Sequence, residues 1–155
     1  VFFCSRRAMD HLRIDLGWAN VVNPMDFLSY DTTPLPDARR FESGTLNTAG
    51  IYGLKACLEL IDEVGIEEIE QRVFLLTDRL CLGLEEKGFQ VISSRRPDEK
   101  SGIVTAHHPG FSAEVILERL RDRGVVATVR GDCLRFSPHY YNSVEEVDTV
   151  LDVLP

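Results

Sequence analysis

From Phe89 to the end of the chain, short apolar runs alternate with amphipathic segments. The runs at 102–107, 125–130 and 133–137 predict strands, because runs rich in β-branched and aromatic residues favour extended backbone. Gly131-Asp132, between the last two runs, predicts a two-residue hairpin turn. The order strand, strand, helix, strand, strand, helix favours an α+β layer with helices packed on an antiparallel sheet.

Two amphipathic helices are predicted before this layer. The second runs from Ile66 to Lys87, has apolar residues every three or four positions and ends at Gly88. The first runs from about Leu46 to Val64 and ends at Gly65. Its pattern predicts four buried positions: Leu54, Cys57, Leu58 and Ile61. The charged segment Ser93–Ser101 is predicted to be a mobile loop.

The first 45 residues are less regular. Val1–Cys4 predicts a short strand and Met9–Leu16 a turn or two of helix, and residues 17–37 form a long loop that contains three prolines. A loop of that length usually has a function or packs on a neighbouring domain. We therefore expect residues 1–45 to be an incomplete segment that follows another domain, and residues 46–155 to be a small α+β domain.

Composition narrows the class of protein. With 155 residues, 44% of them hydrophobic, the chain can form an ordinary core. The formal net charge of -8 disfavours nucleic acid or an anionic membrane as the main partner, and no apolar run approaches the roughly 18 residues that span a bilayer. The cysteines lie far apart, which favours reduced thiols in a cytoplasmic protein. They are Cys4, Cys57, Cys81 and Cys133.

The segment Ser43–Thr48 is a candidate anion site. It places Gly, Thr and Asn at the head of a predicted helix. Unpaired backbone N–H groups and the positive end of the helix dipole bind anions there, often phosphate. The alternative is an ordinary helix cap, and Asn47 could bind either a ligand or the local backbone.

Arg135 is a candidate carboxylate-binding residue. In a strand, Leu134 and Phe136 would face the core, and Cys133, Arg135 and Ser137 would share the other face. An arginine held on a strand presents a planar guanidinium that can bind a carboxylate through two hydrogen bonds. The alternative is a surface arginine paired with a nearby acid.

Other reactive residue types predict less. His107 and His108 are adjacent, so in a strand they face opposite ways, and no third ligand has a suitable spacing; we predict no metal site. Cys133 has no obvious neighbouring base and is interpreted as structural. His139, in the turn after the last strand, is interpreted as a packed or hydrogen-bonded residue.

Two long motifs resemble one family. The run from Arg39 to Leu54 (RRFESGTLNTAGIYGL) resembles a motif of class V aminotransferases, which are fold type I enzymes that use pyridoxal 5′-phosphate. The ending Leu134–Ser143 (LRFSPHYYNS), followed by EEVD, is similar to the C-terminal signature of that family. Phe2–Leu12 and Gly17-Trp18 are similar to the stretch that follows the cofactor lysine of the family. The family includes cysteine desulfurases, selenocysteine lyases, kynureninase and isopenicillin N epimerase.

This resemblance implies a fold and roles for residues. The fold would be the C-terminal small domain of a fold type I enzyme. Gly44 and Thr45 would bind the cofactor phosphate, usually across a homodimer interface, with Asn47 as a supporting residue. Arg135 would bind the α-carboxylate of an amino-acid substrate, and Arg130 would be a second, weaker anion contact. His139 and Asn142 would be supporting positions.

The chain lacks other parts of the family's site. In the family, the Schiff-base lysine and the aspartate that holds the pyridine nitrogen lie upstream, in the large domain. Only Lys55, Lys87 and Lys100 occur here, and none fits that motif. We therefore expect the chain alone to be inactive. In the parent enzyme, its partners would be its own N-terminal large domain, a second subunit and a small amino acid.

The segment between Arg130 and Arg135 bears on the reaction type. Desulfurases of the family carry a reactive cysteine on a long loop before the carboxylate arginine, and only four residues, Gly131–Leu134, stand there in this chain. This favours a transaminase, lyase or epimerase, with a cysteine desulfurase or selenocysteine lyase as the alternative. Outside the family, the alternative is a non-enzymatic α+β module that binds a ligand at the Arg135 face.

Overall fold

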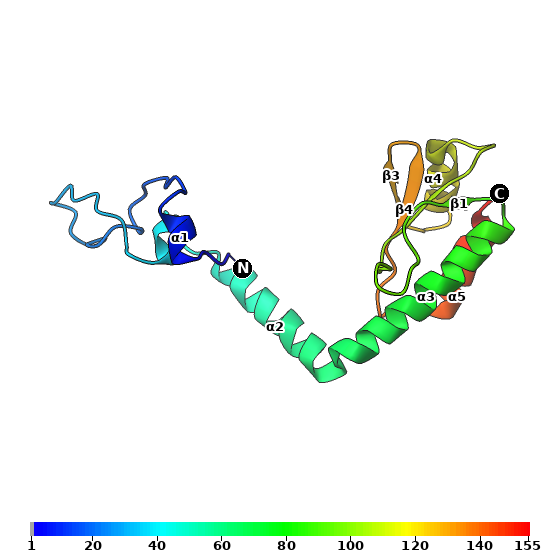
Figure 1. Ribbon diagram of the computed structural model, residues 1–155, viewed down its shortest axis with the longest axis horizontal. Helices are drawn as coiled ribbons and strands as arrows, with labels where there is room; N and C mark the ends of the chain where they lie inside the picture. The colour runs from blue at the N-terminus through cyan, green and yellow to red at the C-terminus, as the bar shows by residue number, and fades with distance from the viewer. Residues whose placement is uncertain (1) are drawn as a thin grey trace. The chain divides into compact units, whose positions relative to one another are not determined.

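The computed structural model describes residues Phe2–Pro155. The chain divides into two compact units, Val1–Cys57 and Leu58–Pro155, which we call unit 1 and unit 2 (Figure 1). Helix α2, Thr48–Val64, begins in unit 1 and ends in unit 2. In the described part of the chain, no helix is both long enough and apolar enough to cross a bilayer.

Unit 2 has the predicted order of elements. These are α3 (Ile66–Glu86), β1 (Gln90–Val91), β2 (Val104–His107), α4 (Ala113–Asp122), β3 (Thr128–Arg130), β4 (Cys133–Phe136) and α5 (Val144–Val153). The four strands form one antiparallel sheet in the order β1-β2-β4-β3. The prediction of an α+β layer is confirmed, and it includes the hairpin turn at Gly131-Asp132 between β3 and β4.

Local sequence signals set the ends of the helices. Gly65 and Gly88 follow α2 and α3 with φ angles of 90° and 81°, a conformation that favours glycine over residues with a Cβ atom. At the start of α5, Ser143 and Glu146 form the capping box. The Glu146 N–H donates to Ser143 Oγ at 3.1 Å, and the Ser143 N–H donates to the Glu146 carboxylate at 2.8 Å.

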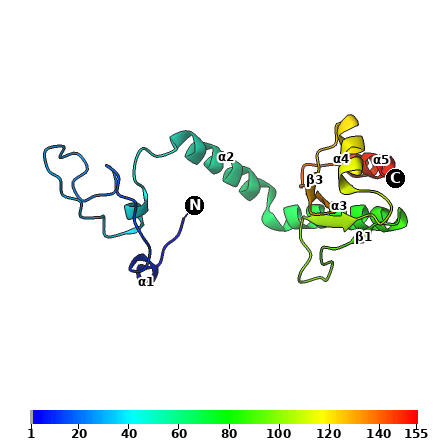
Figure 2. The ribbon, with the colours of Figure 1, turned by 90° about the horizontal axis from the view of Figure 1, so that it is seen from above.

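The core of unit 2 lies on one face of the sheet. Helices α3 and α4 pack on this face, and α5 lies along α3 and also contacts α4 (Figure 1 and Figure 2). The strands contribute Val104, Ala106, Leu134 and Phe136, all nearly inaccessible to solvent. The helices contribute Leu76, Leu80, Leu84, Ile116, Leu120 and Val147. The other face, which we call the open face, carries the residues at alternate positions, and none of these residues belongs to the hydrophobic core.

Replacing Leu76 with Ala should lower the free energy of unfolding by about 2–5 kcal/mol, because the change leaves a cavity in this core. The side chain of Leu76 is fully buried, whereas that of Leu82 on the same helix is 63% exposed. Leu82→Ala is therefore the matched control, with an expected change within about 0.5 kcal/mol. Urea unfolding of the two variants checks this; equal midpoints would contradict the position of the core.

The loop Ser93–Ser101, which the sequence predicts to be mobile, contacts α3 through three hydrogen bonds. Arg95 Nη2 donates to Asp78 Oδ1 at 2.5 Å and to Thr77 Oγ1 at 2.9 Å, and Lys100 Nζ donates to Asp78 Oδ2 at 3.0 Å. The loop sequence alone did not indicate these contacts, because Asp78, the carboxylate that binds both Arg95 and Lys100, lies outside the loop, on α3. Asp78 thus fixes both ends of the loop.

Acid should release this loop. Burial raises the pKa of Asp78, but the hydrogen bonds from Arg95 and Lys100 outweigh burial and hold that pKa below its ordinary value. The contact therefore stabilises the fold above the unfolded pKa of about 3.9 and is lost as the pH falls through the lower folded pKa. Since Asp78 is half exposed, the contribution to stability is small.

Hydrogen exchange of the amides at 93–101, corrected for intrinsic rates, measures this release. We expect faster exchange below about pH 4 and, at neutral pH, in Asp78→Asn. Arg96→Ala is the control, because Arg96 pairs with Glu99 inside the loop and not with α3. Identical exchange in Asp78→Asn and the wild type would show that the contact does not hold the loop.

Unit 1 has little regular structure, and two predictions there need correction. Helix α1 is Arg6–Met9 instead of Met9–Leu16, because the Ser5 hydroxyl accepts a hydrogen bond from the Ala8 N–H and starts the helix early. Phe2–Cys4 is not a strand; Val1, the first residue of that predicted strand, lies outside the described residues. The 3₁₀-helix η1, Ala38–Phe41, follows the long loop.

Helix α2 contradicts the prediction of four buried residues. No residue of α2 is buried, and Leu54 and Leu58 are each about half exposed. Periodicity shows that a helix has an apolar face, but it does not show that the surface covering this face belongs to the same chain. Other large apolar side chains of unit 1 are exposed as well: Phe3, Trp18, Met25, Phe27, Leu28 and Tyr30.

Candidate functional site

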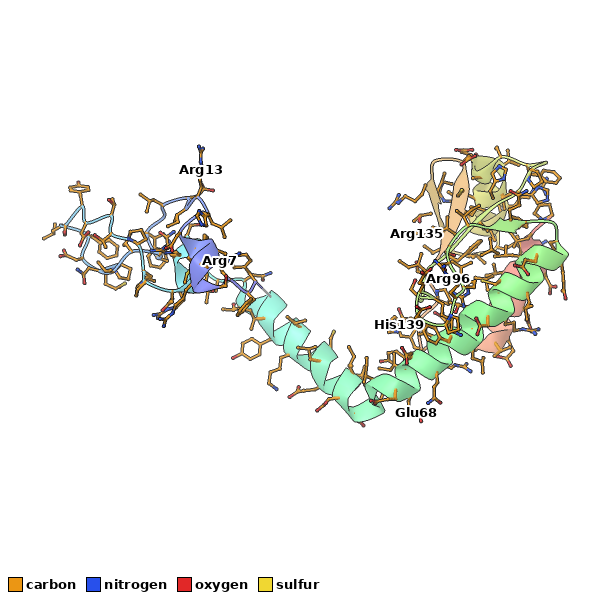
Figure 3. All side chains as sticks on the ribbon, viewed as in Figure 1. Arg7, Arg13, Glu68, Arg96, Arg135 and His139 are labelled. Carbon is orange, nitrogen blue, oxygen red and sulfur yellow. The ribbon has the colours of Figure 1, made fainter. Side chains whose placement is uncertain are left out.

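Arg135 lies on the open face of the sheet, as the strand pattern predicts. Its neighbours Leu134 and Phe136 are buried in the core. Across the sheet, Arg135 pairs with Thr105 of β2 and Thr128 of β3. Its position beside the strands of unit 2 is labelled in Figure 3.

No carboxylate neutralises this arginine. Among residues 2–155, no ion pair includes Arg135, and its Nε atom is buried without a hydrogen-bond partner. The alternative of a surface arginine paired with a nearby acid therefore does not describe this residue. An unpaired guanidinium held at the middle of a sheet is suited to an anionic ligand.

Arg130 lies on the same face of the sheet as Arg135. It pairs with Cys133 across the β3–β4 hairpin, two positions from the Thr128–Arg135 pair, so all four side chains share one face. The Arg130 side chain is exposed, and its Nη1 atom donates only to the carbonyl of Val129 in the described structure, at 3.2 Å. The fold thus brings two positive charges to one face from neighbouring strands.

The segment Ser43–Thr48 combines a helix cap with free donors. Asn47 Oδ1 accepts a hydrogen bond from the Gly50 N–H at 3.0 Å, so its carbonyl oxygen binds the local backbone. The backbone N–H groups of Gly44 and Thr45 have no acceptor among the described residues. These two N–H groups, a few residues before α2, can donate hydrogen bonds to an anion. They lie in unit 1, whereas Arg130 and Arg135 lie in unit 2.

Two further residues support this segment: Asn20, which the sequence analysis did not single out, and Gly17, which it named only as part of the family resemblance. The Asn20 side chain is fully buried; its Nδ2 donates to the carbonyls of Asp15 and Arg40, at 2.9 and 2.8 Å. Gly17 passes so close to Ser43 that a Cβ atom on Gly17 would lie 1.9 Å from the Ser43 carbonyl oxygen. No periodic pattern indicates such contacts, because they join residues far apart in an irregular segment.

Cys133 lacks the features of a reactive thiol. Partial burial, together with a 3.5 Å hydrogen bond to the carboxylate of Asp132, raises the pKa of the Cys133 thiol. A raised pKa leaves little thiolate, which is the nucleophilic form. His107 lies 3.7 Å from the other oxygen of Asp132, and the part of the chain that the structure describes contains no group of three possible metal ligands.

His139 and Asn142 shape the turn after β4. Asn142 Oδ1 accepts from the His139 N–H at 2.8 Å, and the Asn142 Nδ2 donates to Glu146 at 3.1 Å. Arg72 of α3 also donates to the Asn142 carbonyl at 2.9 Å. These contacts link the end of β4 to α5 and α3, which is a structural role.

Comparison with known proteins identifies the family. The sequence matches aminotransferase class-V over residues 4–150. The chain belongs to the aminotransferase class-V family. This is a family of pyridoxal-phosphate-dependent aminotransferases and cysteine desulfurases.

Individual class V relatives are similar along most of the chain. A probable cysteine desulfurase from Pyrococcus abyssi is 28% identical over 167 aligned residues, which cover 99% of this chain and 41% of that protein. A kynureninase from Geobacillus thermodenitrificans is 26% identical, with 89% of this chain and 33% of that protein covered. The apo structure of a cysteine desulfurase from Thermococcus onnurineus has a TM-score of 0.76 at 27% identity, with 90% of this chain and 37% of that chain covered.

The shares covered show that this class V chain matches only part of each relative. It spans about 40% of the length of the longer enzymes and matches their C-terminal portion. The fold expected from the resemblance, a small α+β domain of a fold type I enzyme, is confirmed.

Proposed function

We propose that this chain is the C-terminal part of a pyridoxal-phosphate-dependent enzyme that acts on an amino acid, as a transaminase or a lyase. The observation that carries the proposal is the unpaired guanidinium of Arg135 on the open face of the sheet. An amino acid has one carboxylate that stays unchanged in such reactions, and a fixed arginine is suited to hold it.

Arg135 binds this carboxylate and thereby positions the reacting carbon. Two parallel hydrogen bonds from its guanidinium fix the plane of the carboxylate, and the rigid strand fixes the guanidinium. Holding a substrate in a reactive orientation supplies a large part of catalysis. Arg130, which is exposed on the same face, adds positive charge that attracts the carboxylate.

The residues of unit 1 fit a phosphate group. The free N–H groups of Gly44 and Thr45 donate to the phosphate, and the start of α2 adds the positive end of a helix dipole. By analogy with the family motif, these donors serve the active site of a second subunit in a homodimer. Pyridoxal phosphate, when bound, withdraws electrons from the α-carbon of the substrate.

The lysine that holds the cofactor lies outside this chain in this proposal, so the chain alone is inactive. Lys87 Nζ donates to the carbonyl of Leu154, at 3.0 Å, and Lys100 Nζ donates to Asp78. Lys55 lies on α2. The two former lysines have structural contacts, and none of the three lies on the open sheet face that carries Arg135.

The exposed apolar surface supports a neighbouring domain in the parent enzyme. Helix α2 has no buried residue, and much of unit 1 exposes large apolar side chains. Soluble proteins rarely expose large apolar patches unless another surface covers them. We assign this covering surface to the N-terminal large domain of the parent enzyme, because the similar proteins are much longer than this chain.

A cysteine desulfurase is the second candidate, since desulfurases are among the similar proteins. Against it stand the two-residue hairpin before Arg135 and the raised pKa of the Cys133 thiol. A persulfide-forming cysteine needs an accessible thiolate. Transamination, β-elimination and epimerisation need no such thiol. These reactions therefore agree better with the short hairpin before Arg135 and with the raised pKa of the Cys133 thiol.

Visible absorption of the full-length protein encoded by the natural gene tests the proposal. With pyridoxal phosphate added, we expect a bound-cofactor band that borohydride reduction removes and that this chain alone does not give. With cysteine and a thiol reductant, we expect no joint formation of alanine and sulfide, which are the products of a desulfurase. Absence of the band in the full-length protein would overturn the cofactor assignment.

A further inference from the structure

The cross-strand pair of Thr128 and Arg135 contains two buried polar atoms without partners. Among residues 2–155, three buried side-chain nitrogen or oxygen atoms have no hydrogen-bond partner: Arg95 Nε, Thr128 Oγ1 and Arg135 Nε. Two of these three belong to residues that directly face each other on β3 and β4. A buried polar atom without a partner costs about 1–3 kcal/mol, so this pair is not explained by stability.

The two atoms are chemically complementary. Arg135 Nε carries a hydrogen and can only donate, whereas the threonine hydroxyl can accept as well as donate. Facing residues of an antiparallel pair have Cβ atoms about 4.5–5.5 Å apart, and a threonine moves its hydroxyl between staggered positions by rotating about χ1. A hydrogen bond from Arg135 Nε to Thr128 Oγ1 therefore needs only a side-chain rotation.

Thr105, the other neighbour of Arg135, differs in one respect. It faces Arg135 from β2, and its hydroxyl is not among the buried atoms without a partner. The arginine thus lies between two threonines, of which only Thr128 has a buried, free hydroxyl. This asymmetry gives the two threonines different expected roles.

We propose that Thr128 is a positioning residue for Arg135. Its hydroxyl, which is unpaired in the ligand-free chain, accepts a hydrogen bond from Arg135 Nε when the carboxylate binds. This bond fixes the plane of the guanidinium, so that the two terminal nitrogens face the substrate carboxylate. The inference rests on the proposed function, because it assigns Arg135 to a carboxylate ligand. It extends that function by a residue that sets the strength and geometry of carboxylate recognition.

The test uses the full-length enzyme with bound cofactor. Of the twenty standard L-amino acids, the one that binds the wild type most tightly, measured by the change in visible absorption, serves as the probe. Its decarboxylated amine is the comparison ligand. The variants are Thr128→Val, Thr128→Ser, the matched control Thr105→Val, and Arg135→Ala as the reference for lost carboxylate binding.

Thr128→Val should weaken binding of the amino acid about 10-fold, the low end for a hydrogen bond to a charged group, and leave binding of the amine unchanged. Turnover at saturation should change less than about 2-fold, because the residue acts on binding through Arg135. Thr128→Ser should restore affinity, and Thr105→Val should retain it. The melting temperature of Thr128→Val should not fall, since valine replaces an unpaired buried hydroxyl by a methyl group.

The outcomes separate this inference from the function on which it rests. If Arg135→Ala loses discrimination between amino acid and amine but Thr128→Val does not weaken amino-acid binding, the role of Thr128 is overturned and the proposed function stands. If Arg135→Ala binds the amino acid as the wild type does, or if no amino acid binds the wild type, both are overturned. Thr128→Ala provides the same comparison if the valine variant does not fold.

Discussion

Replacing Arg135 with Ala in the full-length enzyme should reduce kcat/KM for the amino-acid substrate by about 100-fold. A hydrogen bond to a charged group contributes about 1.5–3 kcal/mol, and each 1.4 kcal/mol is tenfold in affinity. The loss should fall mainly on substrate binding, while the affinity for pyridoxal phosphate stays unchanged. Steady-state kinetics and a cofactor titration monitored by visible absorption measure the two quantities separately.

Arg121→Ala is the matched control for this variant. Arg121 is an exposed arginine on α4, which packs on the opposite face of the sheet from Arg135, so its loss changes the net charge equally without touching the open face. We expect wild-type kinetics. If Arg135→Ala and Arg121→Ala have the same kcat/KM, Arg135 does not bind the substrate, and the assignment of a carboxylate site to this sheet fails.

Replacing Gly17 with Ala should disrupt the proposed phosphate-binding segment, Ser43–Thr48. The added Cβ atom would lie 1.9 Å from the carbonyl oxygen of Ser43, and this neighbour is backbone that cannot rotate away. The backbone around Gly44 and Thr45 must therefore shift, at a cost of about 1–3 kcal/mol for overpacking. Such a shift would break hydrogen bonds from these N–H groups to the phosphate, and a hydrogen bond to a charged group contributes about 1.5–3 kcal/mol. We therefore expect cofactor affinity to fall at least 10-fold and activity to fall with it.

Gly53→Ala provides the comparison for the same chemical change. Gly53 lies inside α2, and nothing lies within 4 Å of the position of its added Cβ atom. Alanine in a helix interior is favoured over glycine by about 0.5–1 kcal/mol, so this variant should bind cofactor normally and unfold at a slightly higher temperature. Equal cofactor affinity in the Gly17 and Gly53 variants would show that the Gly17–Ser43 contact does not shape the site.

The sequence predicted unit 2 well because its signals are local. Each signal involves only a few neighbouring residues. The capping residues and the glycines after helices predicted where helices begin and end, and the alternation around Leu134 and Phe136 predicted which face of β4 is buried. The position of Arg135 on the open face followed from the same alternation. The absence of an acidic partner for Arg135 could not be predicted in this way, since it depends on all the elements around the sheet.

Sequence patterns did not reveal contacts that join distant residues, and they did not show that the apolar face of α2 is exposed. The loop Ser93–Ser101 is held by Asp78 of α3, and Asn20 joins Asp15 to Arg40; neither contact leaves a periodic trace. The apolar face of α2 was predicted correctly as apolar and wrongly as buried. Thr128 was not singled out, because a threonine in a strand is ordinary until the bonding of its hydroxyl is known.

The two faces of the sheet in unit 2 have consequences for how such an enzyme changes over evolutionary time. Side chains on the open face contribute little to the core, which is formed by the opposite face and the helices. Under the proposed function, substitutions there can alter which carboxylate compound is held without loss of the folded state, and the proposed phosphate donors, Gly44 and Thr45, lie in unit 1. In that case, substrate choice can diversify through the open face, while the core residues maintain stability and the residues of unit 1 maintain cofactor binding.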